Sequence, residues 1–257
     1  MSNADAVHVY KVGGPALEDP ELIAPLAREV AGLEGHAVLV HGGGRHIQRM
    51  LDALGLESRF VDGRRFTSNE AMEAVEMVLS GVVNKGLAAG LSAAGTPAVG
   101  LSGRDGGMVR ARIEQGLGRV GTPEAVDPAP IRALWNAALL PVVSPVASDA
   151  DGRPVNVNAD EAALGLARAL GARTLVYLSD VDGVRLDGAT ATTLTPAAAA
   201  QRIEDGTIAG GMALKVRVAL EASAAGIPEV VIAGKARLLG TFSGTRLVSA
   251  AALEVRP

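Results

Sequence analysis

The sequence predicts an α/β protein in which one mainly parallel, open β-sheet lies between two layers of helices, a three-layer αβα sandwich. Three observations lead to this fold class. Short runs of Val, Leu and Ile alternate with longer helical patterns, glycines cluster directly after the apolar runs, and 257 residues are enough for one large α/β domain or two lobes. Because aromatic residues make up only 2% of the chain, aliphatic side chains must form most of the core.

The predicted strands are short apolar runs, and the predicted helices carry apolar residues at helical spacing. We expect the strands at 7–12, 37–41, 98–101, 139–143, 174–178 and 229–233, and the helices at 20–34, 45–54, 68–94, 159–170, 196–205 and 212–225. Asp19, Thr67, Asn158 and Thr195 precede four of these helices and are their expected N-caps, with Pro20 at the first position of its helix.

Two further features concern the organisation of the chain. The segment 108–120, which contains Gly116 and Gly118, fits a hairpin added to the sheet better than a helix. A break between two lobes is expected near 171–173, dividing the chain into 1–172 and 173–257. Ligands of such sheets bind at the carboxyl ends of the strands, so the loops that follow the strands are the places to look for chemistry.

Composition excludes several classes of function. The chain has 24 Lys and Arg against 28 Asp and Glu, a formal charge of −4, which gives no electrostatic case for binding nucleic acid. Without any Cys it has neither a disulfide framework nor a thiolate site. No signal peptide or run of 18 apolar residues is recognised, so we expect no membrane partner and a cytoplasmic location.

Two glycine loops follow neighbouring predicted strands. Lys11-Val-Gly13-Gly14 ends the first strand, and His41-Gly-Gly43-Gly44 ends the second. Glycine lets backbone N–H groups approach an anion closely, and the helix that starts near Arg45 adds its positive end. Each loop alone could be an ordinary strand-to-helix turn, but Lys11 at the mouth of the first favours a phosphoryl site between them.

A second group of polar residues lies at the predicted starts of two helices. In Asn156-Val-Asn158-Ala-Asp160, Asn158 is explained as a helix cap, whereas Asn156 and Asp160 are not. Gly210-Gly-Met212 leads to Lys215 in a first helical turn, where the dipole disfavours a cation unless it meets an anion. A carboxylate such as Asp160 could therefore orient lysines, although a solvated surface Lys215 remains an alternative.

Arg64 and Arg65 stand just before the long helix 68–94. A guanidinium group suits a planar carboxylate because it donates two parallel hydrogen bonds, and one member of the pair is expected to be surface charge only.

Two other patterns are rejected. The glycines of 116–121 are followed by Pro123 instead of a helix, which excludes a dinucleotide fingerprint, and Val184 stands where a calcium loop needs a ligand. The four histidines have no metal-ligand spacing.

Taken together, the ordered motifs resemble the amino-acid kinase family, which has a carbamate kinase-like fold, and within it the branch that acts on N-acetyl-L-glutamate. The motifs are Lys11-x-Gly-Gly, His41-Gly-Gly-Gly, Gly63-x-Arg65-x-Thr67, Asn156-x-Asn-x-Asp160, Leu178-Ser-Asp180-Val and Gly211-Met-x-x-Lys215. The match runs nearly end to end. It implies ATP-dependent phosphorylation of the γ-carboxylate of N-acetyl-L-glutamate in arginine biosynthesis, with the amino-acid substrate and dimer contacts on 1–172 and MgATP on 173–257.

The resemblance also implies roles for single residues. Lys11, Lys215 and Asp160 would be catalytic together with Gly14 and Gly44, while Gly43, Gly44, Arg65 and Asn156 would bind the substrate. Nucleotide contacts would come from Lys11, Gly13, Ser179, Asp180, Gly183, Gly210, Met212 and Lys215, with no protein metal ligand because Mg²⁺ would bind through ATP oxygens and water. The γ-carboxylate is ionised at neutral pH, so no general base is needed.

Two alternatives stay open: a kinase of carrier-protein-linked aminoadipate in lysine biosynthesis, and a homologue that senses an amino acid or nucleotide without turnover. We expect a homodimer, with Met72, Val75, Val78, Leu79 and Val82 of the long helix as its candidate face, although this face could equally cover the sheet. The short stretch before Val7 predicts no arginine feedback.

Overall fold

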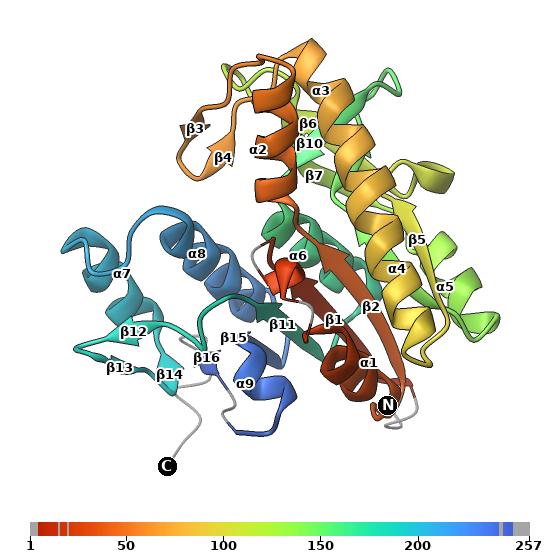
Figure 1. The fold of residues 1–257 in the computed structure, drawn as a ribbon. Helices are drawn as coiled ribbons and strands as arrows, with labels where there is room; N and C mark the ends of the chain where they lie inside the picture. The colour runs from red at the N-terminus through yellow and green to blue at the C-terminus, as the bar shows by residue number, and fades with distance from the viewer. Residues whose placement is uncertain (1–4, 15, 20, 242–243, 249–257) are drawn as a thin grey trace.

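The computed structural model describes residues 5–14, 16–19, 21–241 and 244–248, and its centre is one large β-sheet (Figure 1). The strand order is β14-β16-β15-β11-β1-β2-β8-β5, and neighbouring strands are parallel except at β15 and β16. Its strands are β1 Val7–Val12, β2 His36–His41, β5 Ala98–Ser102, β8 Leu140–Ser144, β11 Thr174–Leu178, β14 Thr193–Leu194, β15 Glu229–Ala233 and β16 Thr245–Leu247. The predicted mainly parallel open sheet is confirmed.

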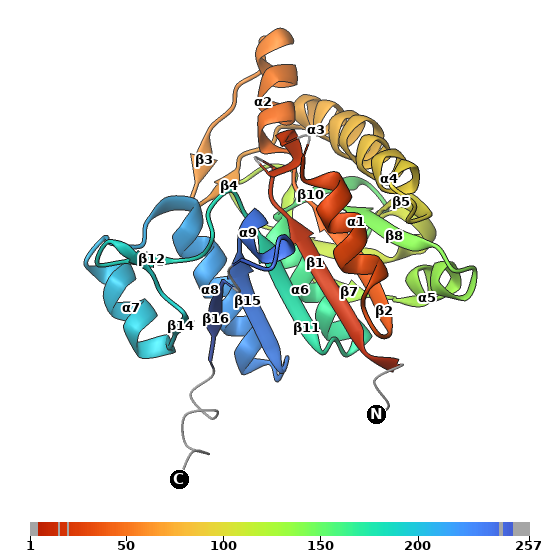
Figure 2. The ribbon, with the colours of Figure 1, turned by 60° about the horizontal axis from the view of Figure 1, so that its bottom comes forward.

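Helices cover both faces of this sheet, because successive strand residues point to opposite sides. On one face, Tyr10 and Val12 of β1 pack with apolar residues of α1 Ile23–Ala31, α4 Asn84–Ala93 and α9 Lys235–Leu238. On the other face, Val9 packs with α5 Ala129–Asn136, α6 Ala159–Leu170, α7 Pro196–Glu204 and α8 Gly210–Ala224. Figure 2 shows α1 in front of β1 with α6 and α8 behind the sheet, which makes the three-layer αβα sandwich.

Three predicted helix starts are wrong. Helix α8 begins at Gly210 rather than at position 212, so Lys215 lies in its second turn and not in its first. Helix α1 begins at Ile23 rather than at position 20, and Asp19 caps nothing there: its carboxylate accepts from the Glu21 amide at 2.9 Å and pairs with Lys235. Pro20 itself lies outside the described residues. The long helix is capped by Ser68, which accepts from the Ala71 amide, instead of Thr67. Both Ser and Thr suit an N-cap, so sequence alone did not separate them. The Asn158 and Thr195 caps are confirmed.

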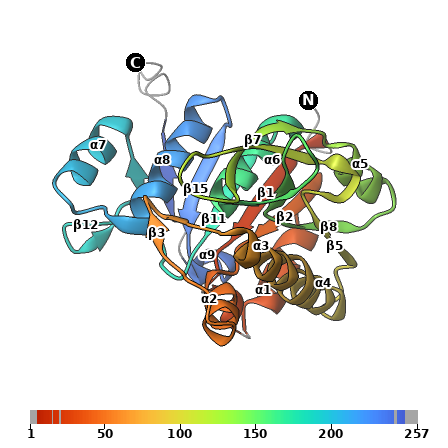
Figure 3. The same cartoon turned by 90° about the horizontal axis from the view of Figure 1, so that it is seen from above.

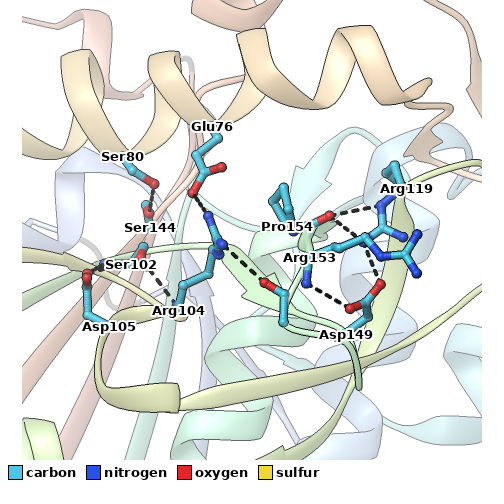
Figure 4. A network of polar contacts seen from close by, with 11 residues as sticks. Glu76, Ser80, Ser102, Arg104, Asp105, Arg119, Ser144, Asp149, Arg153 and Pro154 are labelled. Carbon is cyan, nitrogen blue, oxygen red and sulfur yellow. Dashed lines mark hydrogen bonds and ion pairs between the residues drawn. The ribbon is translucent and has the colours of Figure 1, made fainter.

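The predicted hairpin does not join the main sheet. β6 Val109–Ile113 and β7 Val120–Val126 pair antiparallel, but they close a separate small barrel with β9 Val146–Ser148 and β10 Pro154–Val157. Figure 4 shows the polar contacts around it: Arg104 links Glu76 to the Gly152 carbonyl, and Arg119 reaches Asp149 at 2.8 Å. The barrel is thus separate from the main sheet, and its strand β10 carries Asn156.

The helix predicted at 68–94 is continuous but changes character. It consists of α3 Asn69–Glu76, a π-helical segment η3 Met77–Val83, and α4. By length and composition, Asn69–Ala93 could cross a membrane, with a mean hydropathy of 1.3 over its most apolar window, yet half of that window is buried inside the protein. A helix that packs against the core of a protein satisfies the same criteria of length and composition.

The remaining elements are short. They are α2 Gly44–Ala53, the hairpin strands β3 Phe60–Val61 and β4 Arg64–Arg65, the 3₁₀ turns η2 Ala16–Glu18 and η4 Asp105–Gly107, and the pair β12 Arg185–Leu186 and β13 Ala189–Thr190. Seen from above in Figure 3, the β3–β4 hairpin extends away from α2 toward α8. A Cβ atom on Gly63 would lie 3.1 Å from Leu214 of α8, so the hairpin tip touches that helix.

Candidate active site

A cavity of about 600 Å³ opens at the carboxyl ends of β1, β2 and β11. The chain runs from β1 to β2 on one side and returns to β11 on the other side, so β1 marks the point where the strand order reverses. Open parallel sheets bind ligands at this point. The small barrel contributes Val120 and Asn156 to one wall, and α8 contributes Met212 and Leu214 to another.

Two lysines and one aspartate meet in this cavity although they come from three elements. Lys11 Nζ of β1 lies 2.9 Å from Asp160 Oδ1, and Lys215 Nζ of α8 lies 3.0 and 3.1 Å from the two carboxylate oxygens. Asp160 is in the first turn of α6, which Asn158 fixes by accepting the amide of Asp160. All three residues are buried. The carboxylate therefore holds both ammonium groups side by side and leaves a net positive charge.

Burial and charge together set the protonation of this cluster. Burial would raise the pKa of Asp160, but the charges of Lys11 and then Lys215 outweigh it and hold the pKa at about 2. Burial, followed by the charge of Lys11, lowers the pKa of Lys215 to about 8, and Asp160 opposes that fall. Lys215 also lies over the Tyr177 ring, 5.6 Å from its centroid. At neutral pH the aspartate is charged and Lys215 is mostly protonated.

The two glycine loops lie against each other at the mouth of the cavity. A Cβ atom on Gly14 would lie 3.1 Å from the Gly44 nitrogen and 3.4 Å from the Gly43 nitrogen, so only glycine leaves room before these amides. Gly13 donates to the Leu178 carbonyl at 2.8 Å, which fixes the first loop to the end of β11. Gly44 begins α2, and nothing would contact a Cβ atom there within 4 Å. Backbone donors and a helix N-terminus thus border open space, as anion sites require.

The two neighbouring arginines have different surroundings. Arg65 is buried, donates to Gln48 and Ser58, and reaches the Gly44 carbonyl at 3.0 Å. Burial lowers its pKa, and the charge of Asp52 opposes the shift. The Arg65 guanidinium also stacks over Phe60, 4.5 Å from the ring centroid. This packing holds its planar fork beside the second glycine loop.

Arg64 pairs with Glu161 of α6 and also lines the cavity, so it is more than the solvated surface charge expected for one of the pair. Burial raises the pKa of Glu161, and the hydrogen bond and then the charge of Arg64 oppose this rise. The ion pair joins the β3–β4 hairpin to the first turn of α6, next to Asp160.

The other predicted site residues divide into two groups. Asn156, Ser179, Asp180 and Met212 line the cavity together with Gly13, Gly14, Gly43 and Gly44. Asn156 donates to Thr67 Oγ1 at 3.0 Å, and Ser179 donates to Asp180. Gly183 and Gly210 are not among the lining residues. A Cβ atom on Gly183 would lie 2.5 Å from Thr245 Oγ1, so this glycine is needed for packing, while Gly210 lies beside the lining residue Gly211.

Several cavity residues were missed by the sequence interpretation. They are mainly apolar: Ile47, Phe60, Leu79, Val120, Pro145, Val157 and Leu214. Gln48 and Ser58, which support Arg65, were also missed. Apolar lining residues look like core residues in a sequence. Only the position of Gln48 on the helix after the second glycine loop could have suggested it.

Comparison with known proteins agrees with this fold and site. The chain matches the model of the amino acid kinase family over residues 6–234, and it therefore belongs to that family of kinases. It is 44% identical to the acetylglutamate kinase of Rubrobacter xylanophilus over 244 residues, which is 92% of this chain and 93% of the relative. The acetylglutamate kinase of Roseiflexus sp. is 44% identical over 245 residues, covering 94% and 93%.

Solved structures support the fold. The smu.665 protein of Streptococcus mutans superposes with a TM-score of 0.82 at 24% identity, covering 94% of this chain and 98% of that one. Carbamate kinase from Giardia lamblia bound to AMP-PNP gives a TM-score of 0.68 at 17% identity, covering 96% and 99%. The expected carbamate kinase-like fold is confirmed.

Proposed function

We propose that the chain transfers the γ-phosphoryl group of ATP to the γ-carboxylate of N-acetyl-L-glutamate, producing an acyl phosphate for arginine biosynthesis. The observation that carries this proposal is the Lys11–Asp160–Lys215 cluster beside two glycine loops, in a chain 44% identical to acetylglutamate kinases over most of its length. No other part of the described structure combines two buried cations with paired backbone donors.

The chemistry needs charge stabilisation rather than a base. A carboxylate acceptor is already ionised at neutral pH, so the difficulty is to bring an anion to a polyanion. Lys11 and Lys215 would stabilise the charge on the transferring phosphoryl group, and the amides of Gly14, Gly43 and Gly44 would donate to its oxygens. Asp160 would keep both lysines in place without touching the substrate.

Mg²⁺ fits this site only as a nucleotide-bound ion. In the described chain no group of three or more His, Cys, Asp and Glu side chains is placed to hold a metal. Of the cavity's carboxylates, Asp160 is already paired with two lysines and Asp180 accepts from Ser179. We therefore propose that Mg²⁺ is held mainly by phosphate oxygens and water, where it neutralises charge on the phosphates.

We propose that the acceptor binds to 1–172 and the nucleotide to 173–257. Arg65 and Asn156 of the first part line the cavity on the side of the barrel and hairpin, and Arg65 would bind the α-carboxylate. Ser179 and Asp180 line it from the end of β11 and Met212 lines it from α8, and we place the nearby Gly183 and Gly210 among the nucleotide contacts. A biosynthetic role of this kind suits a cytoplasmic protein.

The test compares acceptors directly. Release of ADP is measured with N-acetyl-L-glutamate, glutamate, aspartate and carrier-linked aminoadipate, and hydroxylamine traps any acyl phosphate as a hydroxamate. We expect N-acetyl-L-glutamate to give the highest kcat/KM and a hydroxamate. Preference for carrier-linked aminoadipate would reassign the chain to that kinase activity, and binding without ADP release from any acceptor would make it a sensor.

A further inference from the structure

A buried polar pair behind the second glycine loop has no part in the chemistry above. His41 ends β2, Asn84 begins α4, and neither side chain is exposed. His41 Nδ1 lies 2.8 Å from the Gly42 carbonyl oxygen, and its Nε2 lies 3.1 Å from the Asn84 amide nitrogen. Buried polar groups are costly unless they are paired, so this arrangement has a defined hydrogen-bond pattern.

The surroundings of Asn84 fix the tautomer of His41. The Asn84 amide nitrogen also faces the Val142 carbonyl at 2.9 Å and the Leu101 carbonyl at 3.2 Å, while its oxygen accepts from Lys85 at 3.2 Å. Carbonyl oxygens can only accept, so this end of Asn84 is the NH₂ group, and its two hydrogens are shared among the two carbonyls and His41. Because the NH₂ group cannot accept, His41 Nε2 facing it is the unprotonated ring nitrogen. The ring proton is therefore on Nδ1, which donates to Gly42.

The ring is neutral at physiological pH. Burial is the main reason that the pKa of His41 falls to about 4, and the bond to Gly42 opposes the fall. The charged or titratable groups that face it are His46 of α2, Lys11 of β1 and Lys85 of α4, all of which lower its pKa further. His41 therefore keeps a single proton throughout the neutral range.

The bond to Gly42 determines where the next amide points. The carbonyl of Gly42 and the N–H of Gly43 belong to one planar trans peptide and point in opposite directions. Holding the oxygen toward His41 directs the Gly43 N–H away from it, toward Gly14 and the cavity, where the Gly43 nitrogen would lie 3.4 Å from a Cβ on Gly14. From η3, Leu79 packs so closely that a Cβ on Gly43 would lie 2.7 Å from it.

We propose that His41, held as the Nδ1–H tautomer by Asn84, is a positioning residue that aims the Gly43 N–H at the transferring phosphoryl group. The proposal rests on the kinase function proposed above. It predicts that kcat depends on a hydrogen-bond donor at the Nδ1 position and not on the imidazole ring itself. Loss of this donor frees the Gly42–Gly43 peptide to rotate, which weakens a contact that is strongest in the transition state.

Two isosteric replacements separate these possibilities. The amide nitrogen of Asn can occupy the place of Nδ1, whereas that of Gln reaches the place of Nε2. We expect His41→Gln to lower kcat by about tenfold or more with little change in KM, and His41→Asn to stay within about threefold of the wild type. His36→Gln, at the exposed start of the same strand, is the control and should keep full turnover. Equal losses of kcat in both His41 variants, at matched thermal stability, would overturn the proposal.

A second measurement does not depend on turnover. ¹⁵N NMR of the histidine rings, assigned with the His41→Gln variant, should show His41 protonated at Nδ1 and unprotonated at Nε2 at pH 7. A proton on Nε2 would overturn the proposal even in an active enzyme. A wild-type chain that phosphorylates none of the acceptors would instead refute the proposed function, and the NMR result would still decide the tautomer.

Discussion

At the scale of single residues, one buried carboxylate holds two buried ammonium groups. Asp160 pairs with both Lys11 and Lys215, but the pKa of Lys215 still falls to about 8 because burial and the charge of Lys11 outweigh the aspartate. Lys215 is thus a buried cation whose proton is held less firmly than that of an ordinary lysine. A bound polyphosphate would restore the missing negative charge and favour the protonated form.

This gives a pH prediction with a definite sign. The cation is the active form, so kcat/KM, which reports the free enzyme, should fall as the pH rises through about 8. The corresponding fall in kcat should come at higher pH, because bound phosphates raise the pKa of Lys215. Steady-state kinetics measured at a series of pH values give both kcat/KM and kcat, and therefore the pH at which each of them falls. In Lys215→Arg the limb should disappear, since arginine stays charged, and its persistence near pH 8 would show that another group titrates.

Arg65 offers a prediction on acceptor binding. Its planar fork reaches the Gly44 carbonyl and Gln48 at the same time, and an ammonium group cannot reproduce that geometry. Arg65→Lys should raise the KM for the acceptor about tenfold or more, which corresponds to about 1.4 kcal/mol. The matched control is Arg64→Lys, because a single amine can still pair with Glu161. A larger KM effect in the Arg64 variant would mean that the carboxylate-binding arginine is the other one.

At the scale of elements, the strands that are buried on both faces could be predicted from the sequence. Strands β1, β11 and β15 have the bounds expected, because a strand buried on both faces is a continuous apolar run. Short strands such as β9, β10 and β16 were missed, since so few residues carry no periodicity. Segment 108–120 was assigned to the wrong sheet because β9 and β10, which close its barrel, were not recognised as strands.

The site followed the same rule. Residues within local motifs, such as Lys11, Gly14 and Asp160, could be recognised, and the structure brings them into one cavity. The His41–Asn84 pair could not be predicted because its members are 43 residues apart and neither belongs to a motif that demands the other. The face proposed for dimer contacts was also misjudged: Met72, Val75, Val78 and Leu79 are buried in their own chain.

The β3–β4 hairpin carries Arg65, so a change at its tip should affect acceptor binding. Gly63 has φ +79°, and a Cβ there would lie 3.1 Å from Leu214. Gly55 has φ +66° with nothing within 4 Å, which makes it a matched control for backbone strain alone. Gly63→Ala and Gly55→Ala should both cost about 1 kcal/mol in thermal unfolding. Only Gly63→Ala should raise the acceptor KM, and an equal rise in both variants would refute the hairpin's role.

At the scale of the whole molecule, the cavity lies between parts of the chain that share one sheet. β1 and β11 pair in register from His8 and Thr174 to Val12 and Leu178, across the expected division between the parts. The long helix Asn69–Ala93 contacts the cavity on one side and solvent on the other. Its inner side packs Leu79 against Gly43, whereas its outer side exposes Met77 and Val82, at 59% and 62%.

We expect the chain to form a homodimer through this outer side of η3. Large exposed apolar residues are few among the described residues, and two of them, Met77 and Val82, lie on this one segment, flanked by exposed Gly81 and Gly86 that would let a second helix approach. Light scattering should give the mass of two chains for the wild type. The double variant Met77→Asp/Val82→Asp should give the mass of one chain, because a two-fold axis places each introduced charge near its own copy. Leu54→Asp, at an equally exposed site at the end of α2, is the control and should stay dimeric. A wild-type monomer, or a double variant that remains a dimer, would exclude this face.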